Sequence, residues 1–355
     1  MRVTFVAPGL APSGGMRVVV EFANRLAGRG HHVTFVGLST AGRTLRRELR
    51  ADVRLLQVAS AGGRYLSFNN LLAGIRLALA VPSSDVIVAT YTPTVLPALI
   101  ASRLLRRGKA VWLHQDFPEQ FVGRRLFHWL LRSAPSRFDG VVTVSRWMAD
   151  NISRVGGVRA TIVGEGISDR ELFFRQRWQG RQDRQPVVTS ICDPRPWKGL
   201  DDLVAAFEIA RESRPQMRAK VLSSSERPAW VPTWLEWLPA TDRVELARVI
   251  ARGTLFVSSS LGEGFGLPPL EAMACGVPVL LTDSGGVRDY ARHLHNCVMT
   301  APRDPVALAS GIVALLDDPD TLNRIAGAGR ETAREFTWDG PVQRFEQALQ
   351  AAKDA

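Results

Sequence analysis

Cysteine and lysine are scarce in this chain, and long apolar runs are missing. The three cysteines, Cys192, Cys275 and Cys297, stand far apart with no C-x-x-C pair, which excludes a disulfide framework and gives no sign of a zinc site. No apolar run reaches the length that crosses a bilayer. The opening residues lack the cationic-then-apolar pattern of a secretion signal. Together these absences predict a cytoplasmic protein.

Recognition motifs for nucleic acids and dinucleotides are absent as well. The sequence shows no helix-turn-helix, no zinc finger and no interleaved aromatic-basic RNA signature. It also lacks G-x-G-x-x-G, which speaks against a dinucleotide-dependent oxidoreductase. We therefore expect no nucleic acid among the partners.

What the chain does contain is a large excess of positive charge in one half. Residues 1–170 hold 23 Lys and Arg against 10 Asp and Glu, whereas the remainder holds 22 against 24. A basic half attracts polyanions such as anionic lipid headgroups or a phosphorylated ligand. We expect the first half to meet an anionic ligand or a membrane surface. A solvated arginine-rich surface is the other interpretation.

Short β-branched runs alternate with helical stretches almost throughout, which predicts an α/β fold with parallel sheets. Several runs are mostly apolar rather than alternating, as is typical of strands covered on both faces. The predicted strands are Val3–Val6, Val33–Gly37, Val53–Val58, Val86–Ala89, Ala110–His114, Gly140–Val144 and Thr161–Val163, then Val187–Cys192, Ala219–Ser223, Leu255–Ser258 and Val279–Thr282.

A polar stretch rich in arginine and glutamine, residues 173–185, interrupts this alternation and ends at Pro186. It has the composition of an interdomain linker. The prediction is a first domain over residues 1–172 and a second over 186–335. Two such sheets leave a cleft where the carboxyl ends of strands can meet a ligand.

The densest pattern is residues 258–290, which predict a strand, a Gly-rich turn and a helix opened by Pro268 and Pro269. Backbone amides at such a helix start favour phosphate. Two glutamates, Glu263 and Glu271, flank the turn with seven residues between them and can face one ligand. Carboxylates are good acceptors for the paired hydroxyls of a sugar.

This segment resembles the E-x7-E region of retaining glycosyltransferases group 1, family 4, whose fold is GT-B. The resemblance spans nearly the whole chain, specific in 258–290 and diffuse elsewhere. It implies two Rossmann-like domains facing a central cleft, with residues 336–355 crossing back as a helix to the first domain. It also implies that Glu271 binds the ribose and Glu263 the donor sugar hydroxyls. The diphosphate would lie against the backbone of Gly264, Phe265, Gly266 and Leu267.

A second element, residues 193–207, resembles the family's Lys-Gly motif, in which the lysine holds the donor phosphates. Lys198 is expected to neutralise the leaving diphosphate, and Gly199 lets the backbone approach closely. The sequence departs from the family here, because the usual arginine five or six residues earlier is replaced by Asp193 and Cys192. Arg195 is the expected substitute. A solvated lysine at a helix start is the alternative interpretation.

Three weaker positions lie in the first half. Gly14 and Gly15 resemble the family's Gly-Gly loop, which approaches phosphates or acceptor. His114, at the end of an apolar strand, matches a family position close to the donor sugar, where it can hydrogen-bond a hydroxyl or steady developing charge. Asp116 is a second candidate. A lone histidine there is otherwise a satisfied polar residue.

Two segments invite other interpretations. Asp318-Pro319-Asp320 spells D-x-D, the metal motif of another transferase fold, but Asp-Pro is common as a helix cap. We expect no metal and no cofactor. Residues 124–132 form a basic amphipathic helix that could lie on a membrane. Core packing of Leu126, Trp129 and Leu130 is the favoured interpretation.

The resemblance implies a hexosyl- or deoxyhexosyltransferase that moves a sugar from a nucleoside-diphosphate donor to an acceptor hydroxyl, with retention. Both glutamates would hold the donor, which favours a front-face route over double displacement. The acceptor, anionic or lipid-linked, would bind the basic first domain, with peripheral membrane contact. Two alternatives stay open, a sugar-nucleotide epimerase and a non-catalytic sugar-nucleotide-binding protein.

Overall fold

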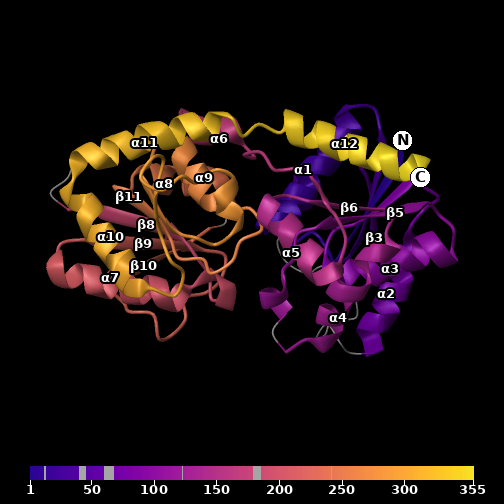
Figure 1. Cartoon of the computed structure of the whole chain (residues 1–355), viewed down its shortest axis with the longest axis horizontal. Helices are drawn as coiled ribbons and strands as arrows, with labels where there is room; N and C mark the ends of the chain where they lie inside the picture. Colours follow the sequence, from indigo (N-terminus) through magenta and orange to yellow (C-terminus); the bar gives the residue numbers. More distant parts are fainter. Residues whose placement is uncertain (12, 40–44, 60–67, 122, 179–184, 241) are drawn as a thin grey trace. The chain divides into compact units, whose positions relative to one another are not determined.

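The computed structural model describes residues 1–11, 13–39, 45–59, 68–121, 123–178, 185–240 and 242–355. The chain forms two compact units (Figure 1). Unit 1 comprises Met1–Ser168 and Trp338–Ala355, and unit 2 comprises Asp169–Thr337. The predicted linker, 173–185, lies partly outside the described residues, and its described start belongs to helix α6 (Arg170–Arg175), where Phe173 is buried.

Unit 1 is built on a seven-stranded parallel sheet with the order β3-β2-β1-β4-β5-β6-β7. Its central strands are apolar and buried at nearly every position, because helices cover both faces. The strands are β1 (Arg2–Ala7), β2 (His32–Leu38), β3 (Arg54–Val58), β4 (Val86–Ala89), β5 (Lys109–His114), β6 (Gly140–Thr143) and β7 (Thr161–Ile162).

Right-handed crossovers distribute the helices of unit 1 between the two faces of this sheet. On one face lie α1 (Gly14–Gly28) and α12 (Asp339–Asp354). Phe345 of α12 packs against Phe22 of α1, with ring centroids 4.5 Å apart. The connections on the other face carry α2 (Phe68–Ala80), α3 (Val95–Leu99), which continues as the π-helical η3 (Ile100–Leu104), α4 (Arg125–Ser133) and α5 (Arg146–Gly156).

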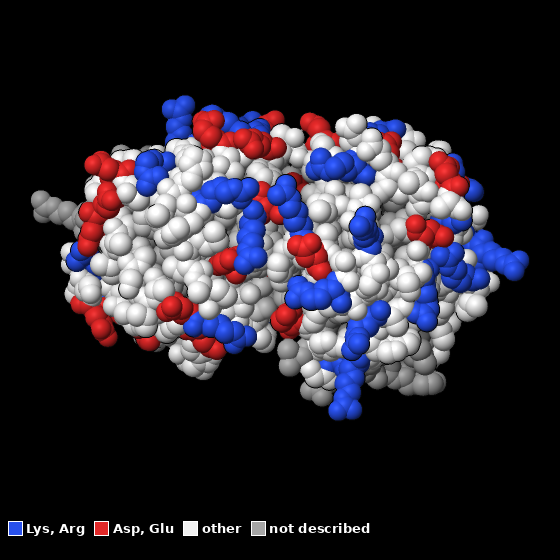
Figure 2. All heavy atoms as spheres, in the orientation of Figure 1, with Lys and Arg blue, Asp and Glu red and all other residues white. Residues whose placement is uncertain are grey.

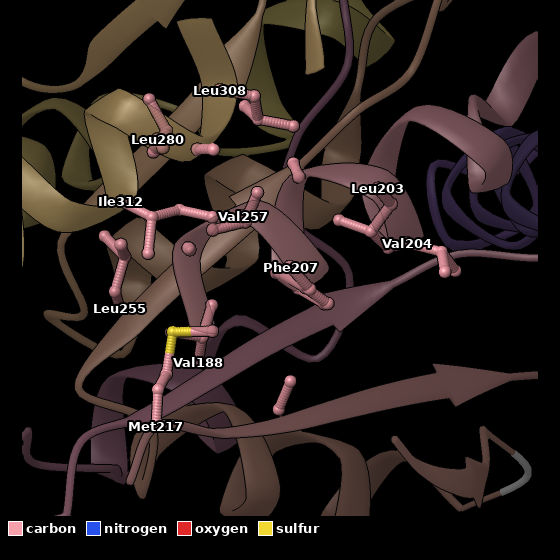
Figure 3. Close-up of a cluster of buried hydrophobic side chains, with 14 of the residues drawn as sticks. Val188, Leu203, Val204, Phe207, Met217, Leu255, Val257, Leu280, Leu308 and Ile312 are labelled. Carbon is pink, nitrogen blue, oxygen red and sulfur yellow. The ribbon is translucent and has the colours of Figure 1, made fainter. Parts of the chain in front are cut away.

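Unit 2 contains a six-stranded parallel sheet with the order β10-β9-β8-β11-β12-β13. The strands are β8 (Val187–Ile191), β9 (Arg218–Ser223), β10 (Glu236–Pro239), β11 (Leu255–Ser258), β12 (Val279–Thr282) and β13 (Val298–Thr300). The helices are α7 (Leu200–Ser213), α8 (Arg243–Ala251), α9 (Leu267–Ala274), α10 (Pro305–Asp317) and α11 (Pro319–Arg334). Figure 3 shows the core between α7, α10 and the sheet, where Phe207 lies among Val188, Val257 and Ile312.

The predicted parallel α/β architecture is confirmed, with two strands added. Neither β10 nor β13 was predicted, because each is half-exposed and lacks a continuous apolar run. The cap interpretation of Asp318 is also confirmed, since its side chain accepts a hydrogen bond from the Thr321 amide at 3.0 Å, at the start of α11.

One packing expectation for α4 is wrong. Leu130 is buried, but Leu126 and Trp129 are 40% and 55% exposed. The core face of this helix is formed by Phe127, Leu130 and Leu131, which follow the three- and four-residue spacing of one helical stripe. Leu126 and Trp129 fall outside that stripe. Among the helices that the structure describes, none is long and apolar enough to cross a membrane.

Candidate active site

The turn between β11 and α9 is held by close backbone contacts. Gly266 has φ +87°, and a Cβ there would lie 2.6 Å from the Val287 side chain. Gly286 is as confined, since its Cβ would lie 2.3 Å from the Gly264 carbonyl oxygen. The Glu263 amide donates to the Ser284 carbonyl at 2.9 Å. Glycine is therefore required on both sides of this turn, which fixes the start of α9.

Two of the predicted donor residues on this turn are packing residues. Phe265 is 4% exposed, and its ring lies 5.7 Å from that of Tyr290 and 5.9 Å from that of Phe336. Leu267 is buried at the first position of α9. The side chains of these two residues therefore serve packing, and the role that the resemblance implied here was one for the backbone alone.

The structure brings Lys198 and Glu263 together, although they come from different motifs. The Lys198 ammonium donates to Oε1 of Glu263 at 2.7 Å, and the Ser260 hydroxyl donates to the same oxygen at 2.7 Å. Their side chains are 15% and 16% exposed, so the pair is screened from most solvent but still reachable. An ammonium group and a carboxylate that can accept hydrogen bonds from sugar hydroxyls thus lie in contact beside the start of α9.

The loop that carries Lys198 is pressed onto the end of β11. Gly199 has φ +61°, and a Cβ there would lie 2.2 Å from the Ser259 carbonyl oxygen. The Leu261 amide donates to the Trp197 carbonyl at 2.8 Å. The close approach that Gly199 makes is to the protein's own backbone. It fixes Lys198 next to Glu263.

Glu271 has a separate partner that the sequence did not reveal. Its side chain is 5% exposed and accepts from Nη2 of Arg243 at 2.8 Å. The same guanidinium donates to Asp169 at 3.1 Å and lies 4.7 Å from the centre of the Phe173 ring. Burial lowers the pKa of Arg243, but Glu271 and Asp169 outweigh burial and raise it above its ordinary value. Arg243 therefore joins Glu271 and Asp169 through one guanidinium.

Where the family carries an arginine, this chain has a buried thiol and a paired aspartate. Burial raises the pKa of Cys192 to about 12, so the thiol stays neutral. Asp193 accepts from the amide and Nε of Arg195 at 3.0 and 2.7 Å, and Nη2 of Arg195 pairs with its other oxygen. Arg195 also lies over Trp197. The expected substitute cation is present but engaged by Asp193.

In unit 1, His114 and Asp116 lie at the carboxyl end of β5. His114 is 1% exposed, and both ring nitrogens lack a hydrogen-bond partner within the part of the chain that the structure describes. Burial lowers the pKa of His114 to about 3, which keeps the ring neutral. Asp116 accepts from the Thr92 amide at 2.6 Å, and burial raises its pKa to about 6.

The predicted Gly-Gly loop opens α1 at the same edge of the sheet. Ser13 caps the helix by accepting from the Met16 amide at 3.1 Å. A Cβ on Gly15 would lie 2.5 Å from the Tyr91 hydroxyl and 3.2 Å from Oε1 of Gln115, whereas one on Gly14 would meet nothing within 4 Å. Gly15 therefore lies beside the residue that follows His114. Within the described ranges, no three His, Cys, Asp or Glu side chains are grouped to hold a metal ion.

Comparison with known proteins now decides the family. Residues 185–318 match the family described as "Glycosyl transferases group 1", and residues 12–171 match "Glycosyltransferase Family 4". A D-inositol 3-phosphate glycosyltransferase of Thermobispora bispora is 32% identical over 97% of this chain and 91% of its own length. The chain belongs to glycosyltransferase family 4. It is thus a glycosyltransferase that uses a nucleotide-sugar donor.

Other relatives of this family 4 transferase agree in length and fold. A phosphatidyl-myo-inositol mannosyltransferase of Propionibacterium freudenreichii subsp. shermanii is 29% identical, over 95% of this chain and 92% of its own. The crystal structure of Anabaena HepE with UDP and glucose superimposes with a TM-score of 0.80 at 19% identity, covering 99% and 100% of the two chains. Sucrose-phosphate synthase of Thermosynechococcus elongatus gives 0.79 at 18%, covering 98% of each. The fold is GT-B.

Proposed function

We propose that this family 4 enzyme transfers a hexose or deoxyhexose from a nucleoside-diphosphate sugar to an acceptor hydroxyl with retention, which gives an α-linkage. The observation that carries the proposal is the meeting of Lys198 and Glu263 beside the start of α9. An ammonium carries three donors, so Lys198 can keep Glu263 in place and still reach a phosphate oxygen. Glu263 then accepts from the donor sugar hydroxyls.

The rest of the donor follows from the same turn. Backbone amides from Gly264 to Leu267 stand at a helix start, where partial positive charge favours the diphosphate. Arg243 occupies one oxygen of Glu271, and the second oxygen accepts from a ribose hydroxyl. UDP is the first nucleotide to test, because it is bound in the HepE structure.

The chemical step proposed is a front-face displacement without a metal ion. The bond from the anomeric carbon to the diphosphate oxygen breaks, and the acceptor oxygen bonds to that carbon on the same face. The departing phosphate oxygen takes the proton of the acceptor hydroxyl. Lys198 and the amides at the start of α9 stabilise the charge that develops on the leaving group. His114 is neutral near pH 7 because its pKa is about 3, so its role is to hydrogen-bond a sugar hydroxyl rather than to supply charge.

We propose an anionic or lipid-linked acceptor held by the basic unit 1. Two relatives are named for inositol 3-phosphate and for phosphatidyl-myo-inositol, and both names describe anionic molecules. Residues 1–170 carry the excess of 23 basic over 10 acidic residues. Three free, buried cysteines fit a reducing cytoplasm, which is the proposed location.

The test is donor turnover across UDP-, GDP-, dTDP- and ADP-sugars, after a thermal-shift screen for binding. Slow release of free sugar supports a transferase. An epimerised nucleotide sugar supports the epimerase alternative, and binding without turnover supports a non-catalytic protein. Glu263→Ala is expected to abolish turnover and keep the fold. Wild-type turnover in that variant would show that Glu263 is not at the reacting sugar.

A further inference from the structure

Exposed apolar side chains gather on one layer of unit 1. Among the described residues, twelve large hydrophobic side chains are exposed, and seven of them lie on α2, on α3 with η3, and on α4. These helices are neighbours, because α3 packs against α2 and α4 packs against the turn that opens α3. The exposed faces of these three segments are called the α2–α4 surface here. Isolated exposed hydrophobics are ordinary, but a group on adjacent helices marks a binding surface.

Helix α2 is apolar on two opposite sides. Ala73 and Leu77 are buried against the unit, while Leu72, Ile75 and Leu79 are 36%, 41% and 56% exposed. The exposed three follow one another at helical spacing and form a stripe along the outside. An exposed apolar stripe of this kind, with the exposed Arg76 beside it, is typical of a helix that lies against a partner surface. We therefore expect the outer stripe of α2 to bind a partner that covers these three side chains.

Helix α4 adds an aromatic side chain and cations to the α2–α4 surface. Trp129 and Leu126 are exposed, and Arg125 and Arg132 are exposed beside them on the same short helix. Within the described part of the chain, neither arginine forms an ion pair with an acidic side chain. Tryptophan with arginine is the combination found where a helix lies in the interface of a membrane.

Charge decides between the partners that an apolar surface could take. Residues 68–137, which carry all three helices, hold nine Lys and Arg against three Asp and Glu. One of the three, Asp116, is buried. Figure 2 shows lysine and arginine side chains, interspersed with acidic ones, over the half of the molecule that holds these helices. A second copy of this chain would bring like charges together, whereas anionic lipid headgroups would complement them.

We propose that the α2–α4 surface docks the enzyme on an anionic lipid bilayer, with Trp129 and the α2 stripe entering the headgroup region and the arginines pairing with lipid phosphates. The proposal deepens the proposed function, on which it rests for the lipid-linked acceptor. A transferase held at the bilayer meets such an acceptor by diffusion in two dimensions.

The experiment is co-flotation of the full chain with vesicles of phosphatidylglycerol and phosphatidylcholine, compared with phosphatidylcholine alone. Binding is expected only to the anionic vesicles, and raising the salt from about 0.1 M to about 0.5 M should weaken it. Trp129→Ser is expected to weaken binding about tenfold. Trp230→Ser is the matched control, because Trp230 is a comparably exposed tryptophan, 52%, in unit 2. It should bind as the wild type does.

A second variant tests the charges, since an arginine near an anionic surface is worth about fivefold in binding. Arg125→Gln with Arg132→Gln should therefore cost roughly 25-fold. Equal binding to neutral vesicles, or wild-type binding by both Trp129→Ser and the double variant, overturns the proposal. So does a chain that ignores vesicles and forms a dimer that Trp129→Ser dissociates. Donor hydrolysis measured without vesicles tests the transferase proposal separately.

Discussion

At the scale of single residues, the proposed donor site of unit 2 contains two ion pairs that join distant parts of the sequence. Lys198 pairs with Glu263, and Arg243 pairs with Glu271. The side chains of the first pair are 15% and 16% exposed, whereas that of Glu271 is 5% exposed. The first pair is proposed to take part in the chemical step and the second to orient the donor, so their loss should appear in different measurements.

Arg243→Met is predicted to lower the free energy of unfolding by about 3 kcal/mol, because it leaves the buried Glu271 without its partner. The donor KM should rise more than kcat falls, since Glu271 is proposed to bind the ribose. Arg243→Lys keeps the charge and should recover part of both losses.

Arg248→Met is the matched control on the same helix. Its pair with Glu245 is half-exposed, so denaturant titration should show a loss under about 1 kcal/mol. Equal losses in the two Met variants contradict the assignment.

Asp193→Asn is predicted to improve donor binding. The carboxylate of Asp193 pairs with the guanidinium of Arg195. Replacing it with a neutral amide weakens this ion pair, while the side-chain oxygen of the asparagine still accepts from the Arg195 amide. A released guanidinium can reach the diphosphate, which should lower the donor KM about tenfold. Adding Arg195→Gln should cancel the gain. An unchanged or higher donor KM in Asp193→Asn contradicts the idea that Arg195 replaces the missing arginine.

Asp116→Asn is predicted to stabilise the protein near pH 7. Burial raises the folded-state pKa of Asp116 from 3.8 to about 6. The folded state therefore binds more protons than the unfolded state between these two values, and stability falls as the pH rises through this window. The asparagine avoids that loss, for a gain of up to about 3 kcal/mol near pH 7 that vanishes below about pH 4. Unfolding titrations of both proteins at the two pH values test this. A gain of equal size at both contradicts it.

At the scale of elements, the sequence predicted every strand of the unit 1 sheet but missed both edge strands of the unit 2 sheet. Strands such as β4 and β12 are buried at every position, and burial on both faces favours their largely apolar composition. β10 and β13 are half-exposed edge strands, so no apolar run marks them.

The partners of Glu271 and Arg195 were also missed. Arg243 opens a helix, where the sequence gives no sign that it is half-buried between Glu271 and Asp169, and these partners lie far along the chain.

The start of α9 gives the prediction at this scale. Gly266→Ala is expected to cost about 2 kcal/mol or more and to abolish donor binding, because the residue has φ +87° and its Cβ would collide with Val287. Gly327→Ala is the matched control. Gly327 lies within α11, and a Cβ there meets nothing within 4 Å, so this variant should gain up to about 1 kcal/mol. Thermal unfolding with and without UDP measures both effects. Full UDP binding by Gly266→Ala would show that the turn does not hold the donor.

At the scale of the whole molecule, each unit has a sheet and a hydrophobic core of its own. Unit 1 is completed by the last segment of the chain, because Phe345 of α12 packs against Phe5 and Phe22 from its beginning. Unit 2 closes around Phe207 and the strands β8 and β11. Separate cores of this kind can unfold in separate transitions.

Paired core variants are predicted to separate those transitions. Phe345→Ala should lower the unfolding temperature of unit 1 alone, and Phe207→Ala that of unit 2 alone, since each removes about 3 to 5 kcal/mol from one core. A ligand stabilises the unit that binds it. UDP should therefore raise only the transition that Phe207→Ala lowers, because the proposed donor residues Lys198, Glu263 and Glu271 all lie in unit 2. Calorimetry of both variants with and without UDP measures this. A rise confined to the transition that Phe345→Ala lowers would place the nucleotide in unit 1 and contradict the donor assignment.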